Sequence, residues 1–207
     1  FSADTMNSHI EVSTFTTVPS APYGSTYSGS TFVESDGNGN YMFYKSSSTK
    51  LEIVGVHTPS ARLNFSGGSD GTLYMWTVGM GYSKSDAFSG TAITATMTGT
   101  ANGNIVVLGS GTGTLIIPGG TVFTNVLQVK SILTATGSFL FGAVTVTLRI
   151  TEYSYYHNSE KFPILTVSYQ NVSGATTSNT AKIKINKAAI VGIDELDMDA
   201  SFTVFPN

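Results

Sequence analysis

Two glutamates are the first residues of this chain whose type and spacing suggest a reaction. Glu152 and Glu160 flank an aromatic stretch, and hydrolysis of a glycosidic bond needs two carboxyl groups that face each other across a cleft. The chain has thirteen acids in all, and four of them cluster between residues 194 and 199. A solvated loop with one or two surface carboxylates explains the pair more simply, so a secreted hydrolase is the second interpretation and not the first.

An Asp-Gly-Asn-Gly-Asn run places oxygen donors at alternating positions, as in the first half of a calcium-binding loop. The donors are Asp36, Asn38 and Asn40. An EF-hand loop requires glycine at its sixth position and glutamate at its twelfth, but Tyr41 and Ser47 stand there. We therefore predict a hairpin turn, with a calcium site as a weak alternative.

The sequence offers few other residues for metal binding or thiol chemistry. None of the three histidines has a second histidine at the spacing of a known metal motif, although a site assembled from distant strands stays open. The chain has no cysteine, which excludes disulfides, thiolate metal sites and a thiol nucleophile. We expect no cofactor.

Aromatic side chains give the better indication of function, because a flat ring can stack on the apolar face of a sugar. Trp76 is the sole tryptophan and lies in an expected strand, where burial is the ordinary outcome. Core packing explains most of the other rings equally well. The candidates for glycan contact are Trp76, Tyr82, Tyr153, Tyr155 and Tyr156.

The composition sets the class of protein that must position these residues. Hydrophobic residues make up 41% of the 207 residues and charged residues only 11%, while Ser and Thr number 55. Such a chain can bury a core, and hydroxyls rather than charges cover its surface, which suits extracellular strands. The net charge of −3 with only two arginines excludes the basic footprint that nucleic-acid binding requires. No apolar run approaches the ~20 residues of a membrane helix.

The periodicity is that of strands almost throughout, with turn residues at 36–40, 67–71, 102–104, 118–120 and 173–174. We predict an all-β fold with little or no helix: an antiparallel β-sandwich, jelly-roll-like or a partly closed barrel. Residues 1–191 should form one domain, with 1–35 as a loosely ordered lead-in lying across it. The expected strands cover residues 10–17, 41–45, 51–56, 73–78, 91–99, 105–117, 124–135, 143–156, 164–169 and 181–185.

The last residues carry a resemblance. Residues 192–196 read GIDEL and residues 202–207 read FTVFPN. They resemble the start of the type A C-terminal sorting domain on cargo of the Bacteroidetes type IX secretion system, where a G-I-x-E-L linker precedes a strand of the form F-x-V/L-Y/F-P-N-P. The resemblance implies an exported passenger followed at 192–207 by a linker and the truncated start of the sorting domain. The start of the signal would be Phe202, Val204, Phe205, Pro206 and Asn207.

Two internal segments extend this resemblance. Residues 113–130 (GTLIIPGGTVFTNVLQVK) and 151–167 (TEYSYYHNSEKFPILTV) are similar to signatures of a family of flavobacterial secreted proteins that carry the same tail. That family supplies no catalytic residue to carry over. Thr5 lies in an Asp-Thr-Met sequence that fits the O-glycosylation pattern of Bacteroidetes.

The first interpretation is therefore a non-enzymatic β-domain, secreted or attached to the outer-membrane surface, that acts in adhesion or glycan contact. Its expected partners are the type IX machinery, through the part of the tail that would follow Asn207, and a glycan or other cell-surface ligand. Oligomeric state is not indicated. Two alternatives stay open: a polysaccharide hydrolase using Glu152 and Glu160, and a filament or matrix subunit that associates through an open sheet edge at residues 181–193.

Overall fold

The computed structural model describes residues 9–27, 29–48, 51–65, 72–74, 79–117, 120–160, 162–174, 177–186 and 203–206. Throughout these ranges the regular structure is strand, apart from the short 3-10 turns η2 (Val18–Ser20), η3 (Gly24–Tyr27) and η4 (Leu140–Gly142). The predicted all-β class is confirmed. Within the same ranges, no helix is long and apolar enough to cross a membrane.

The strands follow one another along the chain as a meander. They are β1 (His9–Thr17), β2 (Phe32–Ser35), β3 (Tyr41–Ser46), β4 (Leu51–His57), β5 (Ala61–Phe65), β6 (Thr72–Tyr74), β7 (Ser83–Thr94), β8 (Thr98–Ile116), β9 (Val122–Phe139), β10 (Val144–Tyr156), β11 (Leu165–Ser173), β12 (Ser178–Asn186) and β13 (Thr203–Pro206).

Eleven of these strands pair in a ring. Each strand from β1 to β12, with β6 left out, is hydrogen-bonded to the next, and β12 pairs with β1. Every pairing is antiparallel except that of β1 with β12, which is parallel. This exception follows from the count, because an odd number of alternating strands leaves the first and last pointing the same way. The sheet is therefore a barrel and has no free edge along its main path.

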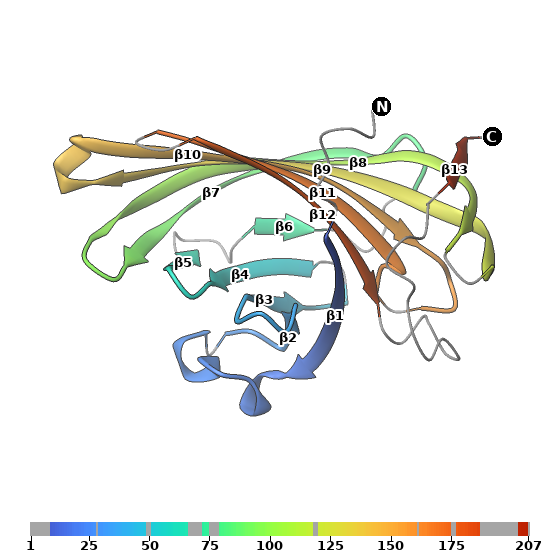
Figure 1. The fold of residues 1–207 in the computed structure, drawn as a ribbon, viewed down its shortest axis with the longest axis horizontal. Coiled ribbons are helices and arrows are strands. Elements are labelled where there is room, and N and C mark those ends of the chain that lie inside the picture. Colours follow the sequence, from blue (N-terminus) through green and yellow to red (C-terminus); the bar gives the residue numbers. More distant parts are fainter. Residues whose placement is uncertain are drawn as a thin grey trace.

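The barrel is flattened. Figure 1 shows the long strands β7–β11 as one layer above the short strands β2–β4, so that the molecule also has the two layers of a sandwich. Two short strands lie off the ring. β6 pairs with the first half of β4 and β5 with the second half, so β5 and β6 act as one interrupted strand. β13 pairs with β8 at residues 113–116.

The interior is filled by side chains from strands on opposite sides of the ring. Ile53 on β4 and Phe65 on β5 cluster with Phe88 on β7 and Ala135 on β9, and Leu148 on β10 packs against them. On β8 the buried residues Ala101, Ile105 and Val107 alternate with less buried neighbours, as expected for strands with one face in a core. The alternation therefore fixes which side chains point inward.

Two further clusters cover parts of the outer face. Tyr27, on the turn segment between β1 and β2, stacks on Phe43 with ring centroids 4.0 Å apart, and its hydroxyl donates to the carbonyl of Val56 at 3.0 Å. On β10–β12, Tyr155, Leu165 and Ile185 lie in register and form a second apolar cluster. A single barrel thus has one internal core and two external ones.

Several predictions about local structure are corrected. Residues 9–35 are not a loosely ordered lead-in, because β1 and β2 belong to the ring. Residues 91–99 do not form one strand, since β7 ends at Thr94 and β8 begins at Thr98. Residues 102–104 are not a turn but lie within β8, paired with both neighbours. The predicted open edge is wrong for residues 181–186, which pair with β11 and, from Lys182, with β1.

Candidate functional site

A row of polar side chains crosses the inside of the barrel. Strand alternation places Glu152, Ser154 and Tyr156 of β10 on the face that carries Leu148, which is the inner face. Ser154 is in register with Thr166 of β11, and Thr166 is in register with Lys184 of β12. One inward row therefore brings a carboxyl group, two hydroxyls and an ammonium group together.

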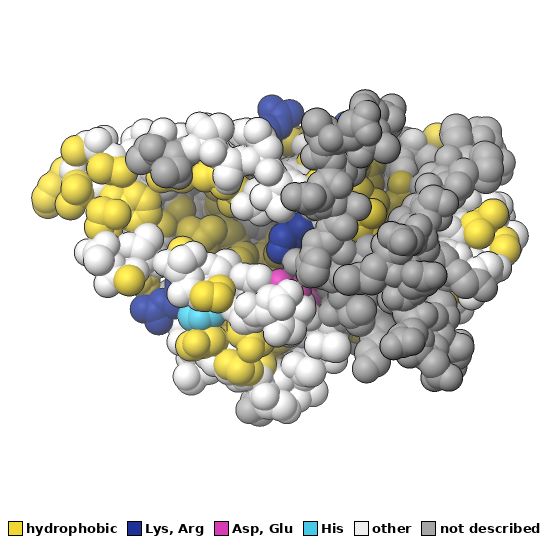
Figure 2. All heavy atoms as spheres, viewed as in Figure 1, with side chains coloured by type: hydrophobic (Ala, Val, Ile, Leu, Met, Phe, Trp, Pro, Cys, Tyr) yellow, Lys and Arg dark blue, Asp and Glu magenta, His cyan; other side chains and the backbone are white. Residues whose placement is uncertain are grey.

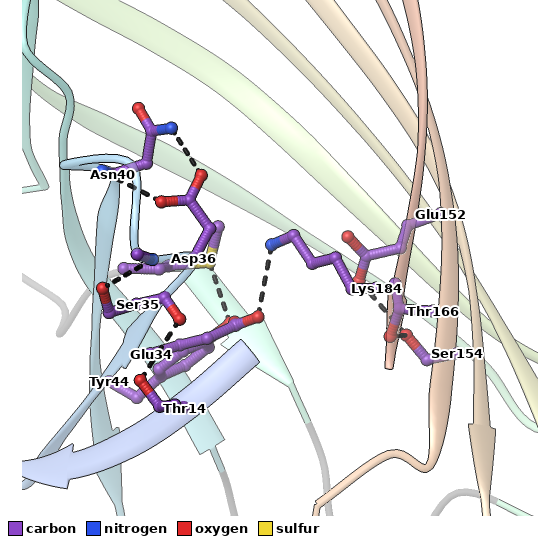
Figure 3. Close-up of polar contacts among 12 residues, drawn as sticks. Thr14, Glu34, Ser35, Asp36, Asn40, Tyr44, Glu152, Ser154, Thr166 and Lys184 are labelled. Atoms are coloured by element: carbon purple, nitrogen blue, oxygen red, sulfur yellow. Dashed lines mark hydrogen bonds and ion pairs between the residues drawn. The ribbon is translucent and has the colours of Figure 1, made fainter. Parts of the chain in front are cut away.

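An ion pair joins this row to the other side of the site. Lys184 Nζ donates to Glu34 Oε1 on β2 at 3.2 Å, and the two side chains are only 19% and 12% exposed. The hydroxyl of Tyr44 on β3 donates to the second oxygen of Glu34 at 2.9 Å. Figure 3 shows Lys184 pointing from β12 toward Glu34, with Glu152 alongside it.

Glu152 has a different environment from Glu34. Ser154 Oγ donates to Glu152 Oε1 at 3.2 Å and lies 3.3 Å from the hydroxyl of Thr166. Burial raises the pKa of Glu152, the charge of Glu34 raises it further, and Lys184 and Ser154 only partly oppose them. Burial, with the charges of Glu152 and Glu34, also raises the pKa of the nearby Tyr156 hydroxyl.

Aromatic rings cover the site. The rings of Phe15 on β1 and Phe162, between β10 and β11, stack with centroids 3.9 Å apart and an angle of 3°. Phe32 on β2 packs edge-on against Phe162 at 5.1 Å and stacks on Tyr44 at 5.0 Å. The rings therefore separate part of the charged cluster from bulk solvent, and Lys184 and Glu34 keep only 19% and 12% of their side-chain surface exposed.

A small cavity lies between the rings and the charged groups. Its volume is about 40 Å³, and Glu34, Glu152, Lys184 and Tyr156 are among the side chains that line it. This is room for about three water molecules. Glu152 keeps some accessible surface because it faces this space.

The chemistry open to this cluster is acid–base chemistry on a very small molecule. Glu34 accepts hydrogen bonds from the ammonium of Lys184 and the phenol of Tyr44, while the pKa of Glu152 is raised. A pair of carboxyl groups with environments that differ in this way can supply one acid and one base. Among the described side chains, no group of three or more histidines and acids is placed to hold a metal ion.

The predicted acid pair is separated by the fold. Glu152 faces the interior, whereas Glu160 lies in the turn after β10, where its N–H donates to the carbonyl of His157 at 3.1 Å. Glu34 takes the place beside Glu152 that the sequence interpretation gave to Glu160. Because Glu34 and Lys184 are 150 positions apart, no local spacing could have identified them. The only available signal was a charged residue at an inward position of an alternating strand.

The predicted glycan-contact tyrosines do not all lie on one face. Tyr155 is buried in the outer cluster on β10–β12, and Tyr156 faces the inside. Tyr153 is half-buried on the outer face, 6.4 Å from the Tyr169 ring, with Lys130 Nζ 5.3 Å from its centroid. Tyr82 precedes β7, and its carbonyl accepts from the N–H of Gly109 at 2.8 Å. Trp76 lies outside the described residues, and the glycan-contact assignment stays a prediction.

The Asp36 run forms the turn of the β2–β3 hairpin, as predicted. Asp36 Oδ1 accepts hydrogen bonds from the backbone N–H groups of Asn38 and Asn40 at 2.8 and 3.2 Å, and Oδ2 accepts one from the Asn40 amide. Burial acts to raise the pKa of Asp36, but these hydrogen bonds outweigh it and the pKa is lowered. The carboxylate is occupied with the turn itself, and this arrangement gives the calcium alternative no support.

The predicted tail is only partly within the described residues. The linker, Phe202 and Asn207 lie outside them, as does Thr5. Of Val204, Phe205 and Pro206 the structure describes the backbone, which pairs antiparallel with β8. Comparisons of the chain with protein-family models, with curated proteins and with solved structures give no match.

Proposed function

We propose that this protein is a non-enzymatic, extracellular β-domain that is exported by the type IX secretion system and contacts glycans. The resemblance of residues 192–207 to a sorting-domain start supports the export route. A charged fraction of 11% and a surface rich in hydroxyls support a location outside the cell. The domain would be released or held at the outer-membrane surface.

The observation that carries the non-enzymatic part of the proposal is the enclosure of the acid pair. Glu34 is bound by Lys184 and Tyr44, and the space beside Glu152 has a volume of about 40 Å³. A glycosidase must fit a sugar ring and often a water molecule between its two carboxyl groups. A cavity of this size is small for a sugar ring, which supports a scaffold role for the inside of the barrel.

A binding screen with the purified domain tests this proposal. The domain is applied to an array of bacterial, plant and algal polysaccharides, and the same polymers are assayed for newly formed reducing ends. We expect retention on at least one polymer without release of reducing ends. Retention on none would contradict glycan contact, and export of the full precursor by cells that lack the type IX translocon would contradict the route.

A second candidate function, hydrolysis, is favoured by one observation. Glu152 has a raised pKa and lies near the carboxylate of Glu34, which is the division of roles that an acid–base pair requires. The aromatic cover formed by Phe15, Phe32 and Phe162 would then have to open for the substrate. Release of reducing ends by the wild type, abolished in Glu152→Gln and in Glu34→Gln, would establish this function in place of the first.

A further inference from the structure

Three side chains form a row on the outer face of β3–β5, on the side of the sheet opposite the charged cavity. Tyr41 is in register with His57, and His57 is in register with Arg62. Their neighbours Met42, Val56 and Leu63 pack into the barrel core, so this row faces outward. Tyr23 lies over it, and we call Tyr23, Tyr41, His57 and Arg62 the tyrosine platform.

The ring of Tyr23 stacks flat on the His57 ring. Its centroid is 3.5 Å from that of His57 with an angle of 21°, and the edge of Tyr41 approaches it at 6.0 Å. One face of the ring is therefore packed. The side chain is still 47% exposed, because the opposite face is turned to solvent. A rigid aromatic face is thus presented without the entropy cost of ordering it on binding.

The backbone of Tyr23 is strained in this position. Its φ is +64°, in the left-handed region that a residue with a Cβ rarely adopts. Such a conformation is unfavourable for a residue with a Cβ, and residues of this kind cluster at functional sites. The turn segment that carries it is fixed by backbone hydrogen bonds from Gly24 to Ala21 at 3.3 Å and from Thr26 to Tyr23 at 2.9 Å.

The imidazole of His57 lies under the Tyr23 ring. It is only 9% exposed, and its Nδ1 has no hydrogen-bond partner in the part of the chain that the structure describes. Burial lowers the pKa of His57, and the charge of Arg62 lowers it further. The imidazole therefore packs as an uncharged ring, and Arg62 is the charged group next to it.

Hydrogen-bonding groups border the platform. The β2–β3 hairpin leads directly into Tyr41 and carries the exposed amide of Asn38, and its Gly39 lies against Pro59 in the β4–β5 turn. Figure 2 shows hydrophobic side chains exposed around a histidine beside a basic side chain, over the ends of β4 and β5. An exposed ring beside a guanidinium donor is suited to a ligand with flat apolar faces and a rim of oxygen acceptors.

We propose that the tyrosine platform binds a sugar ring of an extracellular polysaccharide. The C–H face of the pyranose stacks on the exposed face of Tyr23, and Arg62 donates hydrogen bonds to a hydroxyl or a carboxylate of the same or the next sugar. This inference rests on the proposed glycan contact and gives it a location. It assigns the contact to residues other than the tyrosines of β10.

Affinity electrophoresis through gels that contain a polysaccharide tests the assignment. A neutral glucan and a uronic-acid polymer are used, together with any polymer that retains the domain on the array. Tyr23→Ala should weaken retention about tenfold, the effect of losing a central aromatic contact, while Tyr23→Phe should keep it. Phe141→Ala, which removes an exposed aromatic ring from η4, is the matched control and should bind like the wild type, and Tyr153→Ala tests the competing contact on β10.

Arg62→Gln distinguishes the two kinds of sugar. On the uronic-acid polymer it should weaken retention by about tenfold, with strong dependence on salt, and on the neutral glucan by only about threefold. Urea unfolding of each variant checks that the fold is intact. Retention unchanged in Tyr23→Ala, or lost in Tyr153→Ala instead, would overturn this inference while leaving glycan binding in place. Failure of the wild type to bind any polymer would overturn both.

Discussion

The two faces of the short strands β2–β5 carry opposite kinds of chemistry. Inside, Glu34 and Tyr44 belong to a charged cluster whose members hydrogen-bond to one another. Outside, Tyr23 and His57 form an uncharged stack that has a strained backbone and an unpartnered ring nitrogen. The charged groups of the inner cluster have hydrogen-bond partners inside the barrel. The outer stack is exposed to solvent, and the backbone of Tyr23 is strained. The difference predicts that stability depends on the inner face and the proposed glycan binding on the outer one.

The largest expected effect is the loss of the ammonium group from the interior. Lys184→Met leaves Glu34 and Glu152 without their cation, and breaking a buried pair in this way costs about 3–5 kcal/mol; at 19% and 12% exposure the lower end applies. Urea unfolding measures the change. Adding Glu34→Gln to Lys184→Met should recover much of the loss. Lys84→Met on exposed β7 is the control, expected within about 0.5 kcal/mol of the wild type.

A second change tests the packing of the outer face against the strands. A Cβ at Gly55 would come within 2.1 Å of Tyr27 Cε1 and 2.6 Å of the carbonyl oxygen of Leu63. Gly55→Ala should therefore displace Tyr27 and lower the free energy of unfolding by about 2 kcal/mol. In Gly29→Ala the added Cβ would meet no atom within 4 Å, and that variant should unfold like the wild type. Equal stability of the two variants would show that Tyr27 is not packed against β4.

The third prediction uses pH to sharpen the difference between the faces. The pKa of Glu152 is raised above its ordinary value of 4.5, so the folded state holds its proton more tightly than the unfolded state. Stability should then fall as pH rises from about 4.5 through the folded pKa. Glu152→Gln keeps the hydrogen bond from Ser154 and should remove this part of the slope. Urea midpoints measured between pH 4 and pH 8 check it, and an unchanged slope would contradict the burial of the carboxyl group.

His57 should give a slope of the opposite sign. Its pKa is lowered from 6.5, so the unfolded state binds the proton more readily, and stability should fall as pH drops from about 6.5 through the folded pKa. The effect should be smaller than that of Glu152, since a single ring at the surface covers His57. His57→Gln should flatten the acid side of the profile in the same urea series. A stability that falls on the alkaline side instead would contradict the neutral imidazole.

The smallest effect on stability is expected at Tyr23. Tyr23→Asn places a residue that tolerates the left-handed region at φ +64°, which offsets the lost stacking on His57. The free energy of unfolding should stay within about 1 kcal/mol of the wild type, although polysaccharide binding should weaken about tenfold, as in Tyr23→Ala. A large destabilisation would mean that the platform is part of the core and not a binding surface.

Some of the fold could be read from local sequence. The run at Asp36 and the strand alternation in residues 143–156 were predicted correctly, because a turn type and a two-residue period depend on neighbouring residues. The segment at residues 102–104 shows the limit. Its Asn-Gly-Asn sequence predicts a turn, yet Gly103 lies in the middle of β8, where a Cβ would meet Phe88 and the carbonyl oxygen of Thr134, each at 2.3 Å. Close approach of a distant ring, which no local pattern records, selects glycine there.

By itself, the sequence determined an all-β antiparallel fold without disulfides, and it determined which residues alternate along each strand. Only the tertiary structure decided which face of each strand lies inside, that an odd number of strands closes through a parallel pair, and that Glu152 meets Glu34 and Lys184 instead of Glu160. It also placed Tyr23 on His57. The reason is physical: alternation is set by the geometry of one strand, whereas inside and outside are set by contacts between strands far apart in the chain.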